Sequence, residues 1–275
     1  MLNDNEFSLL RLMPMVLRAR DFRLYAQGGR RLVDLWQNGG AAVLGHTPPS
    51  LLREIKNVAS RGLYAPFPHF LEGRLRAALS RIFPDRDFRL YAAPPPQLET
   101  LVSDNVAALW RPFLDPAAPL SAPENAPPVL IPVTPGIQGW RGDLPLGLCV
   151  LAIKSDFAVS SLPSGDFLPP VLLAAAARGI YDLIAAAGKA AAPQRANPAY
   201  RRVDKALNNP RASFRWRRRG LYLTPEQTPS KEEWEALFRR FLDNGFLLPP
   251  IPSHPAILPS VLSPGEEAKL AALLG

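Results

Sequence analysis

The chain has 275 residues, of which 47% are hydrophobic and 20% charged, as in a globular rather than a disordered protein. Its single cysteine, Cys149, excludes an intrachain disulfide and a metal site built from cysteines. The N-terminus lacks a signal-peptide pattern, and no stretch reaches about 18 uninterrupted apolar residues. We therefore expect a cytoplasmic protein with no membrane partner. The net charge of +8 permits contact with nucleic acid or anionic lipid without establishing either.

Hydrophobic spacing and turn residues predict the elements of the first half of the chain. Residues 22–36 are typical of two short strands around a turn at Gly28 and Gly29. A helix should follow, with Thr47 as its N-cap and Pro48 at its first position. Three further elements are expected: a helix over 70–82, a strand over 88–92 and a helix over 97–110.

Prolines divide the middle of the chain. The 32 prolines are about twice the average usage, and we interpret the stretches in which they gather as loops. These stretches are 94–96, 112–135, 163–170 and 249–259. Between them, short buried strands are predicted at 129–133 and 146–153, and an Ala- and Leu-rich helix is predicted over 170–187.

The last third of the chain has the clearest signals. The segments SFRW and LYLT flank RRRG and predict a hairpin with Gly220 near its turn. Two capping boxes, Ser230–Glu233 and Ser263–Glu266, predict helix starts, the second for a final helix over 264–274. Because hairpins look commoner than long βαβ crossovers, we expect an α+β fold with helices packed on a mostly antiparallel sheet.

Both ends of the chain carry patterns that occur together in one family. The N-terminal pattern comprises Gly29, Arg31, Asp34, Leu44, Gly45, His46 and Pro49. The C-terminal pattern runs from the Ala-rich helix to the final one, through EEWEALFRRFLDNGFLLPPIPSHPAILPSVLSPGEEAKLAALL. In this order they resemble the class-III aminotransferases, the glutamate-1-semialdehyde-aminomutase-like enzymes of pyridoxal-phosphate fold type I.

Three departures from the family pattern imply that cofactor binding and catalysis are lost. Where the family binds the cofactor phosphate through backbone amides, this chain reads Ala92-Ala-Pro-Pro-Pro-Gln97, and proline has no N–H to donate. The Pro-rich stretch 110–135 is too short for the family's central sheet and for the aspartate that pairs with the pyridine nitrogen. Gln138 falls near the Schiff-base lysine, and glutamine forms no imine. The nearest lysine, Lys154, lies beyond that position.

The resemblance therefore implies a shortened and degenerate relative, a small-domain-like remnant of a fold type I transferase. Its expected segments are an N-terminal part over 1–110, a Pro-rich remnant of the large domain over 111–168 and a C-terminal domain over 169–275. We expect no catalytic residue, no cofactor and no metal. A structural, scaffold or regulatory role follows, in a homodimer or with a related protein. The alternative is a working pyridoxal-phosphate aminotransferase or aminomutase.

Isolated polar residues give weaker signals. His46 is typical of a turn cap and Asp34 of a hairpin or dimer contact, while His69 and His254 lack the spacing of metal ligands. One basic cluster has aromatic neighbours and is either a solvated hairpin tip or a nucleic-acid contact, in which arginines bind phosphates and the indole stacks on bases. Its members are Arg215, Trp216, Arg217, Arg218 and Arg219.

Overall fold

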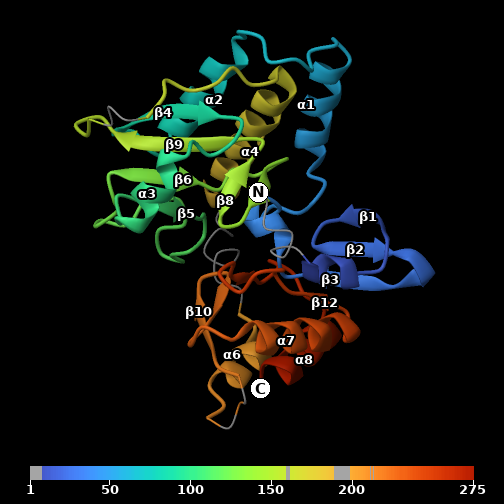
Figure 1. Cartoon of the computed structure of the whole chain (residues 1–275). Coiled ribbons are helices and arrows are strands. Elements are labelled where there is room, and N and C mark those ends of the chain that lie inside the picture. The colour runs from blue at the N-terminus through green and yellow to red at the C-terminus, as the bar shows by residue number, and fades with distance from the viewer. Residues whose placement is uncertain (1–7, 159–161, 189–198, 211, 213) are drawn as a thin grey trace. The chain divides into compact units, whose positions relative to one another are not determined.

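A computed structural model of the chain describes residues 8–158, 162–188, 199–210, 212 and 214–275. The chain forms two compact units, each discontinuous in sequence (Figure 1). Unit 1 comprises Met1–His46, Phe113–Ala117 and Ala190–Gly275, and unit 2 comprises Thr47–Pro112 and Ala118–Lys189. The three segments expected from the sequence follow one another along the chain. Each of the two units instead combines residues from all three of these segments.

One sheet of unit 1 is made from both ends of the chain. β1 (Val16–Arg20), β2 (Arg23–Ala26) and β3 (Arg31–Asp34) form an antiparallel meander. β12 (Phe246–Leu247) then pairs with β3 in parallel. The predicted strand pair around Gly28 is confirmed, and that glycine adopts a φ of 73° at the turn. The pairing of β3 with β12 joins an N-terminal strand to a C-terminal strand, so unit 1 contains residues from both parts of the sequence.

The second sheet of unit 1 contains the predicted hairpin. β10 (Trp216–Arg219), β11 (Tyr222–Pro225) and β13 (Ala256–Ile257) are antiparallel in that order. Arginines 217–219 belong to strand β10 rather than to the turn, because Gly220 and Leu221 alone connect the two strands. Gly220 has a φ of 56°, and a Cβ there would lie 2.1 Å from the carbonyl oxygen of Phe113.

The described part of unit 1 also contains the helices α6 (Arg201–Leu207), α7 (Lys231–Asp243) and α8 (Pro264–Leu274) and short 3₁₀ helices such as η1 (Ser8–Leu12). Both predicted capping boxes are confirmed, with the hydroxyl oxygens of Ser230 and Ser263 accepting from the third helical N–H. The predicted apolar stripe of α7 faces the core of unit 1. Its buried members are Trp234, Leu237, Phe238, Phe241 and Leu242.

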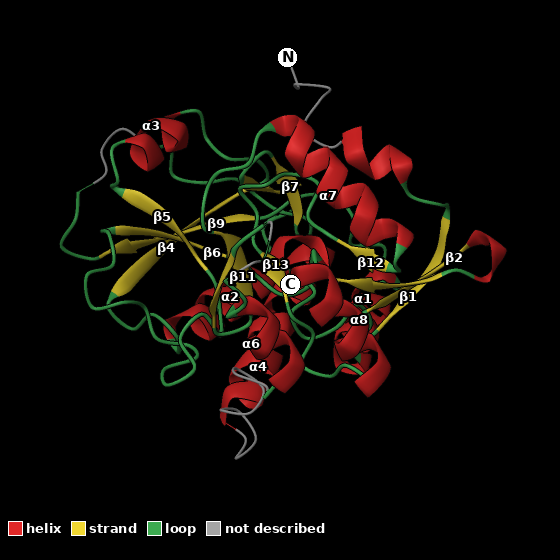
Figure 2. Ribbon diagram, turned by 90° about the horizontal axis from the view of Figure 1, so that it is seen from below, coloured by secondary structure: helices red, strands yellow, loops and turns green. Residues whose placement is uncertain are grey.

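Unit 2 contains a sheet of four strands that lie side by side (Figure 2). Their order is β4 (Arg86–Tyr91), β9 (Cys149–Lys154), β6 (Val129–Pro132) and β5 (Ala107–Trp110). β9 is antiparallel to both of its neighbours, whereas β5 and β6 are parallel. A small hairpin of β7 (Gly139–Arg141) and β8 (Leu144–Leu146) lies between β6 and β9 in the sequence.

Helices α1 (Pro49–Ala59), α2 (Leu71–Ser80), α3 (Gln97–Ser103) and α4 (Pro170–Gly188) belong to unit 2. α4 packs against both α1 and α2. By length and composition α4 is apolar enough to cross a membrane, but half of that stretch is buried inside the protein, as in a core helix. The fold is thus a mixed α+β arrangement of several small sheets and packed helices, as expected from the sequence.

Two predicted elements of unit 2 are corrected. α1 begins at Pro49 and not at Pro48, because Pro48 precedes another proline and has an extended ψ of 126°; Thr47 therefore does not cap it. The helix predicted over 97–110 ends at Ser103. Asn105 turns the chain with a φ of 58°, and residues 107–110 become β5 because they pair with β6.

The Pro-rich residues 112–128 form neither helix nor strand, as predicted. Their far end is fixed by Arg86, which is 6% exposed. Its guanidinium donates to the carbonyl oxygens of Pro128 at 2.8 Å, Ala152 at 3.1 Å and Pro127 at 3.2 Å. Burial lowers the pKa of Arg86. The backbone acceptors bind the two terminal nitrogens of its guanidinium, a structural role that the sequence did not reveal.

Candidate functional site

The segment around Gln138 connects β6 to the β7–β8 hairpin. The Gln138 side chain is 2% exposed. Its Nε2 donates to the carbonyl oxygen of Leu148 at 2.8 Å, and its Oε1 accepts from the Thr134 N–H at 3.1 Å. The amide therefore links the end of β6 to the start of β9. Gln138, which falls near the lysine position of the resemblance, thus links two backbone segments through its side chain.

The segment that follows β4 offers few free N–H groups. The Ala92 N–H donates to Oδ2 of Asp166 at 2.9 Å, and the Ala92 carbonyl accepts from Gly147 at 2.8 Å. Residues 94–96 are prolines and have no N–H. α3 behind them has only seven residues and no side-chain cap. These residues do not fit a phosphate cradle, which requires several N–H groups that converge on one anion.

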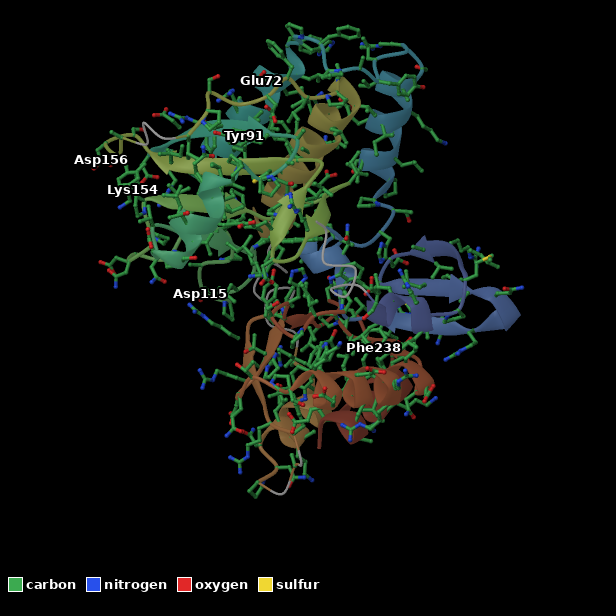
Figure 3. The ribbon with its side chains drawn as sticks, in the orientation of Figure 1. Glu72, Tyr91, Asp115, Lys154, Asp156 and Phe238 are labelled. Atoms are coloured by element: carbon green, nitrogen blue, oxygen red, sulfur yellow. The ribbon has the colours of Figure 1, made fainter. Side chains whose placement is uncertain are left out.

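Lys154 is the last residue of β9 and lies near Asp156 (Figure 3). Its N–H donates to the Pro128 carbonyl at 2.9 Å, and its side chain is half-buried. A strand rises about 3.3 Å per residue, so Lys154 lies roughly 20 Å along β9 from Leu148, the partner of Gln138. A lysine side chain does not span that distance. Every other lysine in the described part of the chain is exposed.

Asp34 is the centre of a polar cluster in unit 1. Its side chain is almost fully buried, and its Oδ2 lies 2.8 Å from Nε2 of His46. Its Oδ1 accepts from the N–H groups of Trp36 and Gln37, both at 2.8 Å. These bonds hold Gln37 in the left-handed region, with a φ of 48°. The structure thus brings together Asp34 and His46, which the sequence treated separately.

A second contact extends this cluster toward the C-terminal part of the chain. The indole Nε1 of Trp36 lies 3.3 Å from Nδ1 of His254, which is fully buried, and Nε2 of Gln37 donates to the Ile257 carbonyl at 3.0 Å. Among the residues that the structure describes, no group of three or more His, Cys, Asp or Glu side chains could hold a metal ion. The cluster connects β3 to the segment before β13, and its geometry is that of a structural network.

The basic cluster alternates along β10. Arg215, Arg217 and Arg219 are exposed, whereas Trp216 is 4% exposed and packs against Trp234 with ring centroids 6.0 Å apart. Arg218 turns inward and pairs with Asp204 at 2.5 Å. The three outward arginines are exposed, although Arg215 also donates to the Pro210 carbonyl at 3.2 Å. Trp216 belongs to the core, and its ring is covered.

An aromatic loop between α1 and α2 was not anticipated from the sequence. Residues 61–70 expose Tyr64 by 62%, Phe67 by 53% and Phe70 by 71%. The available signal was the run LYAPFPHF, in which aromatic residues alternate with prolines and no helical or strand periodicity buries them.

The architecture is the fold of the class-III, fold-type-I pyridoxal-phosphate aminotransferases. An ornithine aminotransferase from Plasmodium yoelii superposes with a TM-score of 0.65 over 95% of this chain and 92% of its own, at 11% identity. A glutamate-1-semialdehyde aminomutase from Pseudomonas aeruginosa PAO1 gives the same TM-score over 95% and 86%, at 13% identity. An omega-transaminase from Sphaerobacter thermophilus gives 0.63 at 10% identity, over 95% and 90%. At these identities the likeness concerns the fold alone.

Sequence relatives add no function. An uncharacterized protein of Treponema pallidum (strain Nichols) is 29% identical over 92% of this chain and 91% of its own length. A second uncharacterized protein, from Borreliella burgdorferi, is 41% identical over 23% of each chain. No protein-family model matches the chain.

Proposed function

We propose that this chain is a non-catalytic protein with an aminotransferase fold, shortened in its large domain, which acts as a structural, scaffold or regulatory partner in the cytoplasm. The observation that carries the proposal is Gln138. Its amide is hydrogen-bonded to two backbone partners on different segments, and it falls near the position where the family resemblance places the cofactor lysine. An amide has no nucleophilic amine, so it cannot form the imine on which this class of chemistry depends.

The remaining groups support the same proposal. Residues 94–96 supply no N–H donors for a phosphate, and Lys154 lies at the far end of β9 from the Gln138 segment. The buried Asp34 carboxylate is occupied by His46 and two backbone N–H groups. The residues present therefore do not fit pyridoxal phosphate as a bound cofactor.

The test is spectroscopic. The purified full chain is mixed with pyridoxal phosphate and scanned at about 400–430 nm, where a pyridoxal imine absorbs. It is then reduced with borohydride and mapped by mass spectrometry. We expect no saturable band and no stoichiometric adduct. A band that saturates at one cofactor per chain, with a reduced adduct on a single lysine, would show instead that the chain is a pyridoxal-phosphate enzyme.

A matched variant separates a specific site from random labelling. Surface lysines form weak imines with excess aldehyde, so the scan is repeated with Lys154→Arg. Lys154 is the one half-buried lysine that the structure describes; Lys56, Lys205, Lys231 and Lys269 are exposed. Equal, trace labelling in both proteins is the expected result. Loss of a stoichiometric adduct in Lys154→Arg alone would identify Lys154 as a cofactor lysine and overturn the proposal.

The partner that we propose is a second copy of this chain or a related protein. Light scattering coupled to gel filtration measures the mass directly. We expect a mass above that of one chain, 30.2 kDa, at micromolar concentration. A monomer at every concentration would exclude the homodimer and leave a different protein as the partner.

A nucleic-acid role is a second candidate because Arg217 and Arg219 of β10 and Arg215 just before it are all exposed. Exposed arginines contact phosphates, so binding should weaken steeply as salt rises. The test compares the wild type with Arg217→Ala/Arg219→Ala on single-stranded RNA and DNA at two salt concentrations. The variant Arg239→Ala, which removes an exposed arginine of α7, is the control. Equal binding by all three proteins would remove this role.

A further inference from the structure

The loop between α1 and α2 presents aromatic side chains to solvent. Tyr64, Phe67 and Phe70 lie within seven residues, and each exposes more than half of its surface. Exposed apolar residues are ordinary when scattered singly, but a group of large aromatics on one loop indicates an interaction site. The loop connects the C-terminal end of α1 to the N-terminal end of α2, and both helices pack on α4 (Figure 1).

The charged residues within and just before this loop in the sequence are mostly basic. No acidic residue occurs between Glu54 and Glu72, whereas Lys56 and Arg61 lie in this interval and Arg53 just before it. All three cations are exposed. The two flanking glutamates are already neutralised, because Glu54 pairs with Arg74 at 2.6 Å and Glu72 pairs with Arg76 at 2.7 Å. The charges of this stretch are therefore basic apart from two paired glutamates, and this charge balance is complementary to an anionic partner.

The loop backbone is stiff and projects its side chains outward. Pro66 and Pro68 fix two of its φ angles. The described loop hydrogen bonds are local, from Tyr64 N to Gly62 O and from Phe67 N to Ala65 O, both between residues two apart. The loop is anchored at its end, where Nδ1 of His69 accepts from the Leu71 N–H and Leu71 is 3% exposed.

We propose that this loop binds an anionic membrane surface. Tyr and Phe rings are suited to the boundary between headgroups and acyl chains, and exposed lysine and arginine side chains attract anionic lipids. Tyr64, Phe67 and Phe70 enter that boundary while Arg53, Lys56 and Arg61 remain among the headgroups. A loop that exposes aromatic side chains and contains no strand is suited to a deformable lipid surface. The proposal revises the expectation of no membrane partner, which rested on the lack of a spanning segment.

The first test is co-sedimentation of the full chain with extruded vesicles. Vesicles of phosphatidylcholine with phosphatidylglycerol are compared with vesicles of phosphatidylcholine alone. We expect binding to the anionic vesicles that is lowered at least about tenfold in Tyr64→Ser/Phe67→Ser/Phe70→Ser, because three large apolar groups no longer leave water. Lys56→Gln/Arg61→Gln should weaken binding in a salt-dependent way. The control is Phe167→Ser/Val261→Ser, since both residues are exposed, by 60% and 64%, at other places.

A second readout detects entry of the loop itself. A Phe67→Trp variant is mixed with anionic vesicles that contain brominated acyl chains, which quench tryptophan on contact. We expect extra quenching relative to the wild type, whose five tryptophans are buried or half-buried. Binding that is equal in the triple serine variant and the wild type would overturn the proposal, as would absence of vesicle binding by the wild type. A triple variant that turns a dimer into a monomer, with no vesicle binding by either protein, would assign the loop to a second copy.

Discussion

A lysine introduced at position 138 would meet an environment built for an amide. Gln138→Lys removes the acceptor of the Thr134 N–H and places an ammonium in a site that is 2% exposed. We expect a loss of about 2–4 kcal/mol in the free energy of unfolding. The buried Thr134 N–H loses its acceptor, and the new ammonium is buried without an anionic partner. Urea unfolding measures the loss. Gln97→Lys, at an exposed helix position, is the control and should change stability by less than about 0.5 kcal/mol.

Gln138→Lys also tests whether a pyridoxal-phosphate pocket is still present around this position and lacks only its lysine. If the segment around Gln138 retained a cofactor pocket, Gln138→Lys would gain a pyridoxal imine band without losing stability. A variant as stable as the wild type would show that the two backbone hydrogen bonds of Gln138 do not hold β6 to β9.

Cys149 should be chemically silent in the folded protein. It is the first residue of β9, an inner strand of the sheet of unit 2, and is fully buried. Burial raises the pKa of its thiol to about 12, above its ordinary value of about 8.5. The thiolate is the reactive form, so at pH 8 we expect almost no reaction with an aromatic disulfide reagent. Reaction should follow the unfolding transition as urea is added. A rapid stoichiometric reaction without denaturant would contradict the buried position of this strand.

At the scale of elements, α4 lies against the segment after β6 through a glycine. A Cβ at Gly179 would be 2.0 Å from the carbonyl oxygen of Pro135, a distance that no real contact reaches. Gly179→Ala should therefore destabilise unit 2 by about 1–3 kcal/mol, although alanine is the better helix former. Gly73→Ala in α2 is the matched control, since no atom lies within 4 Å of its added Cβ. Thermal unfolding should show a small gain for Gly73→Ala and a clear loss for Gly179→Ala.

Glu266 joins the start of α8 to β2. Its carboxylate accepts from Nε of Arg23 at 2.9 Å and from the Ser263 N–H at 2.8 Å. Burial opposes ionisation of Glu266, but the hydrogen bonds and charge of Arg23, with the Ser263 N–H, outweigh it and lower the pKa to about 2. Because this pKa lies below the ordinary value of about 4.3, the stabilisation is complete above that pH and disappears as the pH falls toward 2.

Glu266→Gln should therefore cost most near neutral pH. We expect a loss of about 2–3 kcal/mol at pH 7, which shrinks when unfolding is measured at pH 3 and approaches zero near pH 2. The comparison is Glu235→Gln, whose pair with Arg239 is solvent-exposed and should contribute less than about 0.5 kcal/mol. A cost for Glu266→Gln that does not depend on pH would show that the charge of Glu266 contributes nothing.

Local elements were predictable because their signals lie close together in sequence. The capping boxes of α7 and α8 each span four residues, and both form as expected. The helix predicted over 97–110 was wrong because hydrophobic spacing alone cannot tell a buried strand from a buried helix face. β5 owes its conformation to β6, about twenty residues away, and nothing within 107–110 indicates that partner.

At the scale of the whole molecule, the fold was recognisable from the order of patterns at the two ends of the chain. The contacts of the candidate site were not, because they join distant positions. His254 contacts Trp36 across more than two hundred residues of sequence, and Gln37 donates to Ile257 across a similar separation. The bonding of Gln138 to Leu148 and Thr134 was equally hidden, since a glutamine in a loop is ordinarily a solvated residue. The sequence indicated that Gln138 falls near the lysine position. The structure shows that its amide links two backbone segments.

The pairing of β3 with β12 also determines when unit 1 can close during synthesis. Its first strands leave the ribosome early, but their partner strand begins at Phe246 and the helix that pairs with Arg23 begins at Pro264. Unit 2 is complete once Lys189 has been made. Unit 2 therefore has all of its sequence before unit 1 does. The β1–β3 meander can pair within itself, while the other edge of β3 waits until Phe246 and Leu247 have been made.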